Sequence, residues 1–202
     1  MKQKIKEFIF SDEENILISE ALKTAKPWKY ADAESIRKKI HSFHYDLTEQ
    51  KCCYCQKNML GEFKLDIDPE HILPSSKFKS LSYTIWNLSV ACKRCNMMIK
   101  KARVDFINDQ CTDQKCRDHY YFIHPSFDDF NTHLQRFAVE SPGLRIVKYV
   151  VRTPGKGRYT FDYFKLKDLE IGSFDISLGI SIPNETSEAA SSVRRLEDDL
   201  GI

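Results

Sequence analysis

The sequence lacks a long apolar run, an export signal and a strong net charge. None of its apolar stretches approaches the roughly 20 residues that a membrane-spanning helix needs. Phe8-Ile9-Phe10 is followed at once by Asp12-Glu13-Glu14, which is too short and too acidic for the apolar part of a signal peptide, so we expect a cytoplasmic protein. The formal net charge is only +2, so any electrostatic footprint of a charged partner must be local.

What the chain does contain is enough apolar residues for a core. Its 202 residues are 42% hydrophobic and 12% aromatic, which suits one domain of ordinary size with appendages. We expect an α+β protein in four segments: an N-terminal helical region (1–49), a compact core (50–104), a mixed extension (105–180) and a tail (181–202). No internal repeat is visible.

The helical region is predicted from local patterns. Ser11-Asp12-Glu13-Glu14 is a helix-start signal, and a rough apolar stripe follows it up to Leu22. A second helix is predicted at about 31–47, where Ile36, Ile40 and Phe43 are spaced by four and three residues.

Shorter elements are predicted after residue 50. Residues 63–67 alternate like a strand that continues past Pro69, and the segment after Cys95 is rich in helix formers. Residues 131–139 suggest a short helix. Residues 144–151 and 158–164 suggest two strands of a hairpin joined by 153–157, and the tail suggests a helix through Val193 and Leu196.

The seven cysteines are the strongest chemical signal. Without an export signal they argue for metal ligation rather than disulfides. Two Cys-x-x-Cys pairs, Cys52 with Cys55 and Cys92 with Cys95, can complete the four-thiolate shell that structural Zn²⁺ favours, with Cys53 as a spectator. Buried free thiols or one redox pair are the less favoured alternatives.

The other two cysteines, Cys111 and Cys116, are spaced too loosely for a knuckle, and we interpret them as core or surface thiols. A structural zinc alone gives no activity, because such knuckles also serve as plain binding modules.

The residues between and after the cysteine pairs carry a family resemblance. The order Cys-x-Tyr-Cys, Glu70-His71-Ile-x-Pro, Asn87-Leu, Cys-x-x-Cys-Asn96 and then a lysine-bearing helix resembles the zinc-containing HNH nucleases. The resemblance covers about residues 51–103. It implies a ββα-metal core, in which two strands and a helix bracket one catalytic metal ion.

The resemblance implies a role for each matching residue. His71 would activate water, Asn87 would hold the histidine loop, and Asn96 would ligate the catalytic ion. Glu70 occupies the position of the acidic ligand, which is more commonly Asp, and Asp68 is a rival ligand. The implied products carry a 5′-phosphate and a 3′-hydroxyl.

These residue types also suit phosphodiester hydrolysis on chemical grounds. An imidazole has a pKa suited to taking a proton from water near neutral pH. A hard cation such as Mg²⁺ or Mn²⁺, held by one carboxylate and one amide oxygen, keeps sites free for phosphate and water.

Basic residues crowd the second knuckle and the segment after it. We interpret them as contacts to a nucleic-acid backbone, although a solvated helix face is the plainer alternative. They are Lys93, Arg94, Lys100, Lys101 and Arg103, and Lys77 and Lys79 would extend the track. Trp86 and Tyr83 are expected to pack the core.

Three downstream residues, His124, Asp128 and His133, could be imagined as a second metal site, but packing and turn roles fit their spacing better. The His-Pro-x-x-Asp segment followed by a hairpin is similar to the HNH subunits of Septu and retron anti-phage ATPase–nuclease pairs. That resemblance implies an ATPase partner, with the helical N-terminus or the acidic Glu197-Asp198-Asp199 available for docking.

We therefore expect a metal-dependent HNH endonuclease, with DNA favoured as substrate. An RNA nuclease, for instance one acting on tRNA, is an alternative, because hydrolysis by external water needs no 2′-hydroxyl. The second alternative is a zinc-dependent nucleic-acid-binding module that has lost cleavage activity. Nothing resembles a helix-turn-helix or another reader of base edges.

Overall fold

The computed structural model describes residues 5, 7–63, 66–141, 144–171 and 195. They fall into two compact units, Met1–Phe130 and Asn131–Ile202, each of which is described by itself. The predicted tail, with its helix through Val193 and Leu196, lies outside the described residues apart from Arg195. Within the described residues, no helix is both long and apolar enough to cross a membrane.

The first unit begins with two helices, α2 (Asp12–Leu22) and α3 (Glu34–Leu47), joined by the short turns η1 (Pro27–Lys29) and η2 (Ala31–Ala33). The predicted start at Ser11 is confirmed, because Glu14 N donates to Ser11 Oγ at 3.2 Å and Ser11 N donates to Glu14 Oε2 at 2.8 Å. The second predicted helix is confirmed as η2 followed by α3.

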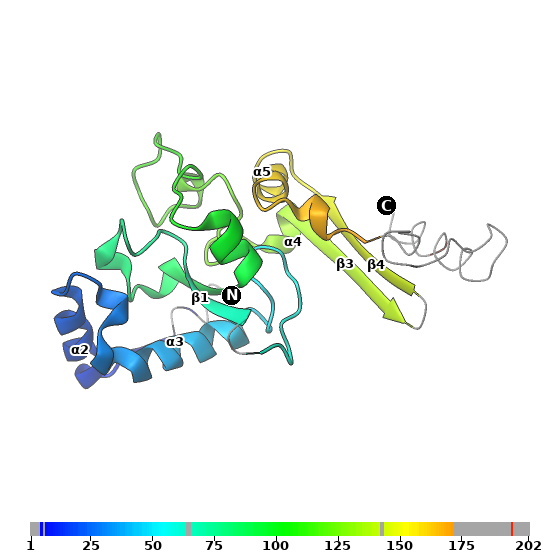
Figure 1. The fold of residues 1–202 in the computed structure, drawn as a ribbon. Coiled ribbons are helices and arrows are strands. Elements are labelled where there is room, and N and C mark those ends of the chain that lie inside the picture. The colour runs from blue at the N-terminus through cyan, green and yellow to red at the C-terminus, as the bar shows by residue number, and fades with distance from the viewer. Residues whose placement is uncertain (1–4, 6, 64–65, 142–143, 172–194, 196–202) are drawn as a thin grey trace. The chain divides into compact units, whose positions relative to one another are not determined.

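The α3 helix covers one side of a small sheet (Figure 1). It buries Ile36, Ile40 and His44, which are four residues apart and therefore share one face. Ile36 and Ile40 belong to a core cluster with Tyr83 and Leu88, so the N-terminal helices and the sheet share one core.

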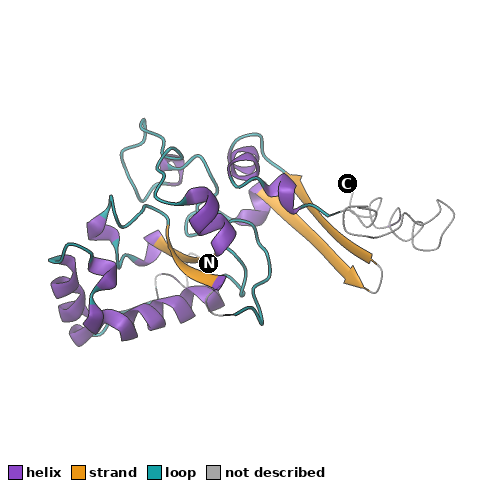
Figure 2. Ribbon diagram, in the orientation of Figure 1, coloured by secondary structure: helices purple, strands orange, loops and turns teal. Residues whose placement is uncertain are grey.

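The sheet consists of β1 (Ile67–His71) and β2 (Leu88–Cys92), which pair antiparallel with Glu70 opposite Ser89 and His71 opposite Leu88. The strand therefore begins at the last residue of the predicted 63–67 segment and runs through Pro69. The helix predicted after Cys95 is present as η6 (Arg94–Lys100), a π-helix that begins directly after β2 (Figure 2).

The described part of the first unit also contains the short turns η4 (Lys79–Leu81), η5 (Ile85–Asn87) and η7 (Arg117–His119). The η4 and η5 turns lie in the connection between the two strands, and η5 ends where β2 begins. Phe106, Tyr120 and Phe122 form a buried aromatic cluster beyond η6.

The second unit contains a hairpin of β3 (Leu134–Ser141) and β4 (Leu144–Val151), with α5 (Lys156–Tyr163), η8 (Leu166–Leu169) and all but the first residue of α4 (Phe130–His133). The strand at 144–151 is confirmed. The helix predicted over 131–139 is wrong beyond His133, because the segment from Leu134 pairs with β4 along its whole length.

The strand predicted at 158–164 is also wrong, because those residues form most of α5. β4 already pairs with the preceding strand, and Gly157, Thr160 and Phe164 are buried at helical spacing. The segment 153–157 leads into that helix rather than closing a hairpin. Gly157 is required there, because an added Cβ would lie 2.1 Å from the His133 carbonyl oxygen.

The predicted α+β class is confirmed as a mixture of helices and small sheets with a cysteine cluster in the first unit.

Candidate functional site

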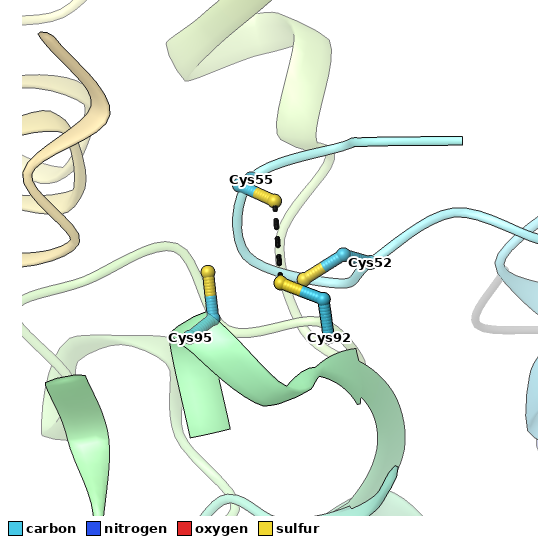
Figure 3. A group of neighbouring side chains, drawn as sticks. All are labelled: Cys52, Cys55, Cys92 and Cys95. Carbon is cyan, nitrogen blue, oxygen red and sulfur yellow. Dashed lines mark hydrogen bonds between the residues drawn. The ribbon is translucent and has the colours of Figure 1, made fainter. Parts of the chain in front are cut away.

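Four cysteines from two parts of the first unit meet at one point. Cys52 and Cys55 lie on the loop after α3, Cys92 ends β2, and Cys95 lies in the first turn of η6. Their Sγ atoms lie within 4.8 Å of one another and face a common centre (Figure 3).

The cluster has dimensions that suit a structural zinc. The Sγ atoms of Cys55 and Cys92 are 3.8 Å apart. Zn–S bonds of about 2.3 Å in a tetrahedron place sulfur atoms at about that separation. Three of the four side chains are buried and Cys92 is half-buried. These cysteines are therefore close enough to hold a metal ion, and the closed, all-thiolate shell is compatible with structural zinc.

The remaining cysteines stand apart from this group. Cys53 is buried, and burial raises the pKa of its thiol well above the usual range, so it stays protonated. Cys111 and Cys116 are half-buried. Among the described residues, no other group of three or more metal-ligating side chains meets.

His71 ends β1 with its imidazole fixed on one side. Its Nε2 atom lies 3.0 Å from the carbonyl oxygen of Ser82. A carbonyl oxygen only accepts, so Nε2 carries the proton and Nδ1 carries a lone pair. The Trp28 ring meets the imidazole edge to face, with centroids 4.6 Å apart. Burial lowers the pKa of His71 to about 4, so the ring is a neutral base at neutral pH.

Asn87, fully buried at the end of η5, holds the loop that follows His71. Its Oδ1 accepts from Leu73 N at 2.8 Å, and its Nδ2 donates to the carbonyl oxygens of Leu73 at 3.1 Å and Leu81 at 3.3 Å. Leu81 precedes Ser82, so one side chain ties the loop beyond the histidine to the segment that holds its ring.

Glu70 and Lys100 form a buried ion pair. Lys100 Nζ lies 2.6 Å from Glu70 Oε1, and their side chains are 1% and 2% exposed. The Tyr54 hydroxyl donates to the same Oε1 at 2.9 Å. Burial raises the pKa of the Glu70 carboxyl, and the Lys100 ammonium opposes that rise. Lys100 was expected among the exposed phosphate contacts, whereas the structure places it in the core.

Asp68 and Asn96 form a second pair at the edge of the sheet. Asn96 Nδ2 donates to Asp68 Oδ2 at 3.2 Å, and Lys93 Nζ lies 3.2 Å from Asp68 Oδ1. Within the described part of the chain, no donor reaches Asn96 Oδ1 or Glu70 Oε2. Each of these oxygens therefore keeps its acceptor capacity.

A cavity of about 210 Å³ brings three of the predicted site residues together. Its lining includes Glu70, His71 and Asn96, but not Asp68 or the buried Asn87. The full lining comprises Pro69, Glu70, His71, Pro74, Ser75, Ser76, Asn96, Lys100, Lys101 and Ala102.

The other basic residues differ in their solvent exposure and in their ion pairing. Lys101 is exposed at the cavity rim. Lys93 and Arg94 are half-exposed, and exposed Arg103 pairs with Asp105. Lys77 and Lys79 are exposed after the His71 segment.

The downstream histidine segment has the packing role that was preferred for it. Asp128 Oδ2 accepts from His124 N at 2.8 Å, and Ser126 N donates to His124 Nδ1 at 3.1 Å, which closes a turn. Ser126 Oγ donates to the Trp86 carbonyl oxygen at 2.9 Å, so this turn supports the residue before Asn87. His133 belongs to the other unit.

Sequence reasoning missed Tyr54, Ser82 and the internal role of Lys100. Only the position of Tyr54 inside the first cysteine pair gave any signal.

Comparisons of the chain with protein-family models, with curated proteins and with solved structures find no match.

Proposed function

We propose that this chain is a metal-dependent HNH endonuclease that hydrolyses phosphodiester bonds, with DNA as the favoured substrate. The observation that carries the proposal is the cavity whose lining includes a neutral His71 together with Glu70 and Asn96. The order β1, β2 and η6 supports it, because the base ends the first strand and the amide follows the second on a helix.

His71 is the proposed general base. With Nε2 donating to Ser82 O, the Nδ1 lone pair can take a proton from water, and the resulting imidazolium keeps its bond to the carbonyl. Asn87 is a positioning residue, because it touches the loop around the histidine and does not line the cavity.

The donor set fits a hard divalent cation. Glu70 Oε2 and Asn96 Oδ1 are a carboxylate and an amide oxygen, the ligand types that Mg²⁺ and Mn²⁺ accept. The hydrogen bond from Asn96 Nδ2 to Asp68 turns the amide so that its oxygen is the atom left over, which favours Asp68 as an orienting group over Asp68 as a ligand. A bound cation would supply positive charge beside the scissile phosphate.

The proposed structural zinc and the basic residues proposed to contact the nucleic-acid backbone have separate roles. A zinc ion in the cysteine cluster would join the loop at 52–55 to the start of η6, which carries Asn96 directly after Cys95. Lys101, which lines the cavity, would hold phosphates without reading sequence, and Lys93 and Arg94 would extend these contacts.

A cleavage assay with a matched histidine control tests the proposal. Wild type, His71→Ala and His41→Ala are incubated with supercoiled plasmid and, separately, with total cellular RNA, in Mg²⁺, Mn²⁺ or EDTA. His41 lies on α3, outside the proposed machinery. We expect metal-dependent plasmid cutting that falls by about 100-fold or more in His71→Ala, the range of a general base, and is unchanged in His41→Ala.

Two results would contradict the assignments. Undiminished cutting by His71→Ala would overturn the base, and absence of cutting by zinc-loaded wild type would overturn the nuclease. Cutting confined to RNA would reverse the preference for DNA.

A further inference from the structure

The Lys100 ammonium is a buried charge in the first unit. It ends η6, its side chain is 1% exposed, and it lies 5.8 Å from the centroid of the Phe106 ring. A buried ammonium is costly unless hydrogen bonds and an opposite charge compensate it. Two acceptors do so here: Glu70 Oε1 at 2.6 Å and the His71 carbonyl oxygen at 2.7 Å.

These two contacts fall on consecutive residues of β1, one proposed to hold the cation and the other proposed to be the base. Lys100 thus donates a hydrogen bond to the backbone of His71 and forms an ion pair with the carboxylate of Glu70. Asn96 lies four residues earlier on the same helix. The η6 helix therefore contributes Asn96 to the cavity lining, and its Lys100 side chain binds both β1 residues.

The brace formed by these Lys100 contacts continues to the cysteine loop. Tyr54 stands between Cys53 and Cys55, and its hydroxyl donates to the same Glu70 Oε1 at 2.9 Å. Two donors occupy Oε1, so Oε2 is the carboxylate oxygen left for the cavity. A continuous chain of contacts thus runs from the cysteine loop through Tyr54, Glu70 and Lys100 to the backbone of His71.

We propose that Lys100 is a positioning residue that holds Glu70 and His71 in their working geometry, and that it makes no contact with nucleic-acid phosphates. The inference rests on the proposed nuclease function. It reassigns the one basic residue of the track whose side chain is buried.

Two neighbouring lysines separate positioning from phosphate contact. Lys100→Met removes the buried ammonium, and Lys101→Met removes the exposed one at the rim. We expect kcat of Lys100→Met to fall by about 100-fold, the scale of a misplaced catalytic group, with little change in KM. Lys101→Met should raise KM and reduce the slope of log binding constant against log salt by about 0.9, the loss of one phosphate contact.

Tyr54→Phe is a milder second variant, because it keeps the buried ring and removes only the hydroxyl. It should fold and retain its zinc, while kcat falls by several-fold at unchanged KM. A lower salt slope for Lys100→Met, or kcat unchanged in both Lys100→Met and Tyr54→Phe, would overturn the proposal.

Hydrogen–deuterium exchange keeps the test independent of cleavage. Peptides that cover residues 67–74 should exchange at least about tenfold faster in folded Lys100→Met than in wild type, a larger increase than in peptides from α3. Unchanged exchange would contradict the brace even in a protein that cuts nothing. Faster exchange without any wild-type cleavage would leave the brace standing and the proposed function refuted.

Discussion

The Glu70–Lys100 pair gives a sharp stability prediction, because removing one partner leaves the other charge in the core. Each side chain is at most 2% exposed, and breaking such a pair costs about 3–5 kcal/mol. We expect about 3 kcal/mol for Lys100→Met and for Glu70→Gln alike, the low end of that range, because each surviving group keeps a hydrogen bond. Glu70 keeps the Tyr54 hydroxyl, and Lys100 keeps the His71 carbonyl.

The double variant Lys100→Met/Glu70→Gln carries no unpaired charge. Independent effects would add to about 6 kcal/mol, whereas we expect about 3 kcal/mol, a coupling of about 3 kcal/mol. Most of the residual cost is the His71 carbonyl oxygen, which loses its donor in the core.

Urea unfolding of the zinc-saturated variants at pH 7 measures all three values. The exposed pair of Lys38 and Glu34 on α3 is a matched control, because its atoms are also 2.6 Å apart. Its removal should not measurably change the free energy of unfolding. Additive losses in the Glu70–Lys100 double variant would refute the reasoning that the two charges compensate each other.

Three further predictions concern other parts of the first unit. Cys92→Ser should lose bound zinc and the cooperative unfolding transition together, and a folded, metal-free variant would show that the four cysteines are not one site. Asn87→Ala should lower the midpoint of thermal unfolding and kcat together, because buried backbone groups of Leu73 and Leu81 lose their partners; retained activity would contradict its positioning role. Burial lowers the pKa of His44 to about 3, so below about pH 6.5 the unfolded chain binds a proton that the folded chain does not bind. The free energy of unfolding should therefore decrease as the pH is lowered, by up to about 1.4 kcal/mol per pH unit. His44→Leu should flatten the pH dependence of the unfolding free energy between about pH 6.5 and pH 3, and an unchanged profile would contradict this account.

Features set by neighbours in the chain were predictable from the sequence. The capping box at Ser11 involves residues three apart, and each cysteine knuckle involves residues three apart. The spacing of the two pairs then predicted that they would meet, because a single zinc shell needs four ligands.

Features set by long-range packing were not predictable. Residues 158–164 alternate like a strand, yet the preceding strand was already paired and their buried positions follow a helix. In the sequence, Lys100 is one more basic residue of the segment after Cys95, and only the fold shows that its ammonium contacts Glu70 and a carbonyl oxygen. The DNA preference, the ATPase partner and the cytoplasmic location stay predictions from the sequence.

The adjacency of Cys95 and Asn96 has a consequence for how the protein comes into being. Cys95 belongs to the four-cysteine cluster, and Asn96 is the proposed oxygen donor for the catalytic cation. On these assignments, a newly made chain without zinc would lack an anchored start of η6, and with it the cavity for the proposed cation. Zinc binding would then complete the fold and the proposed active site in one step, and the proposed nuclease would stay inactive until that metal is supplied.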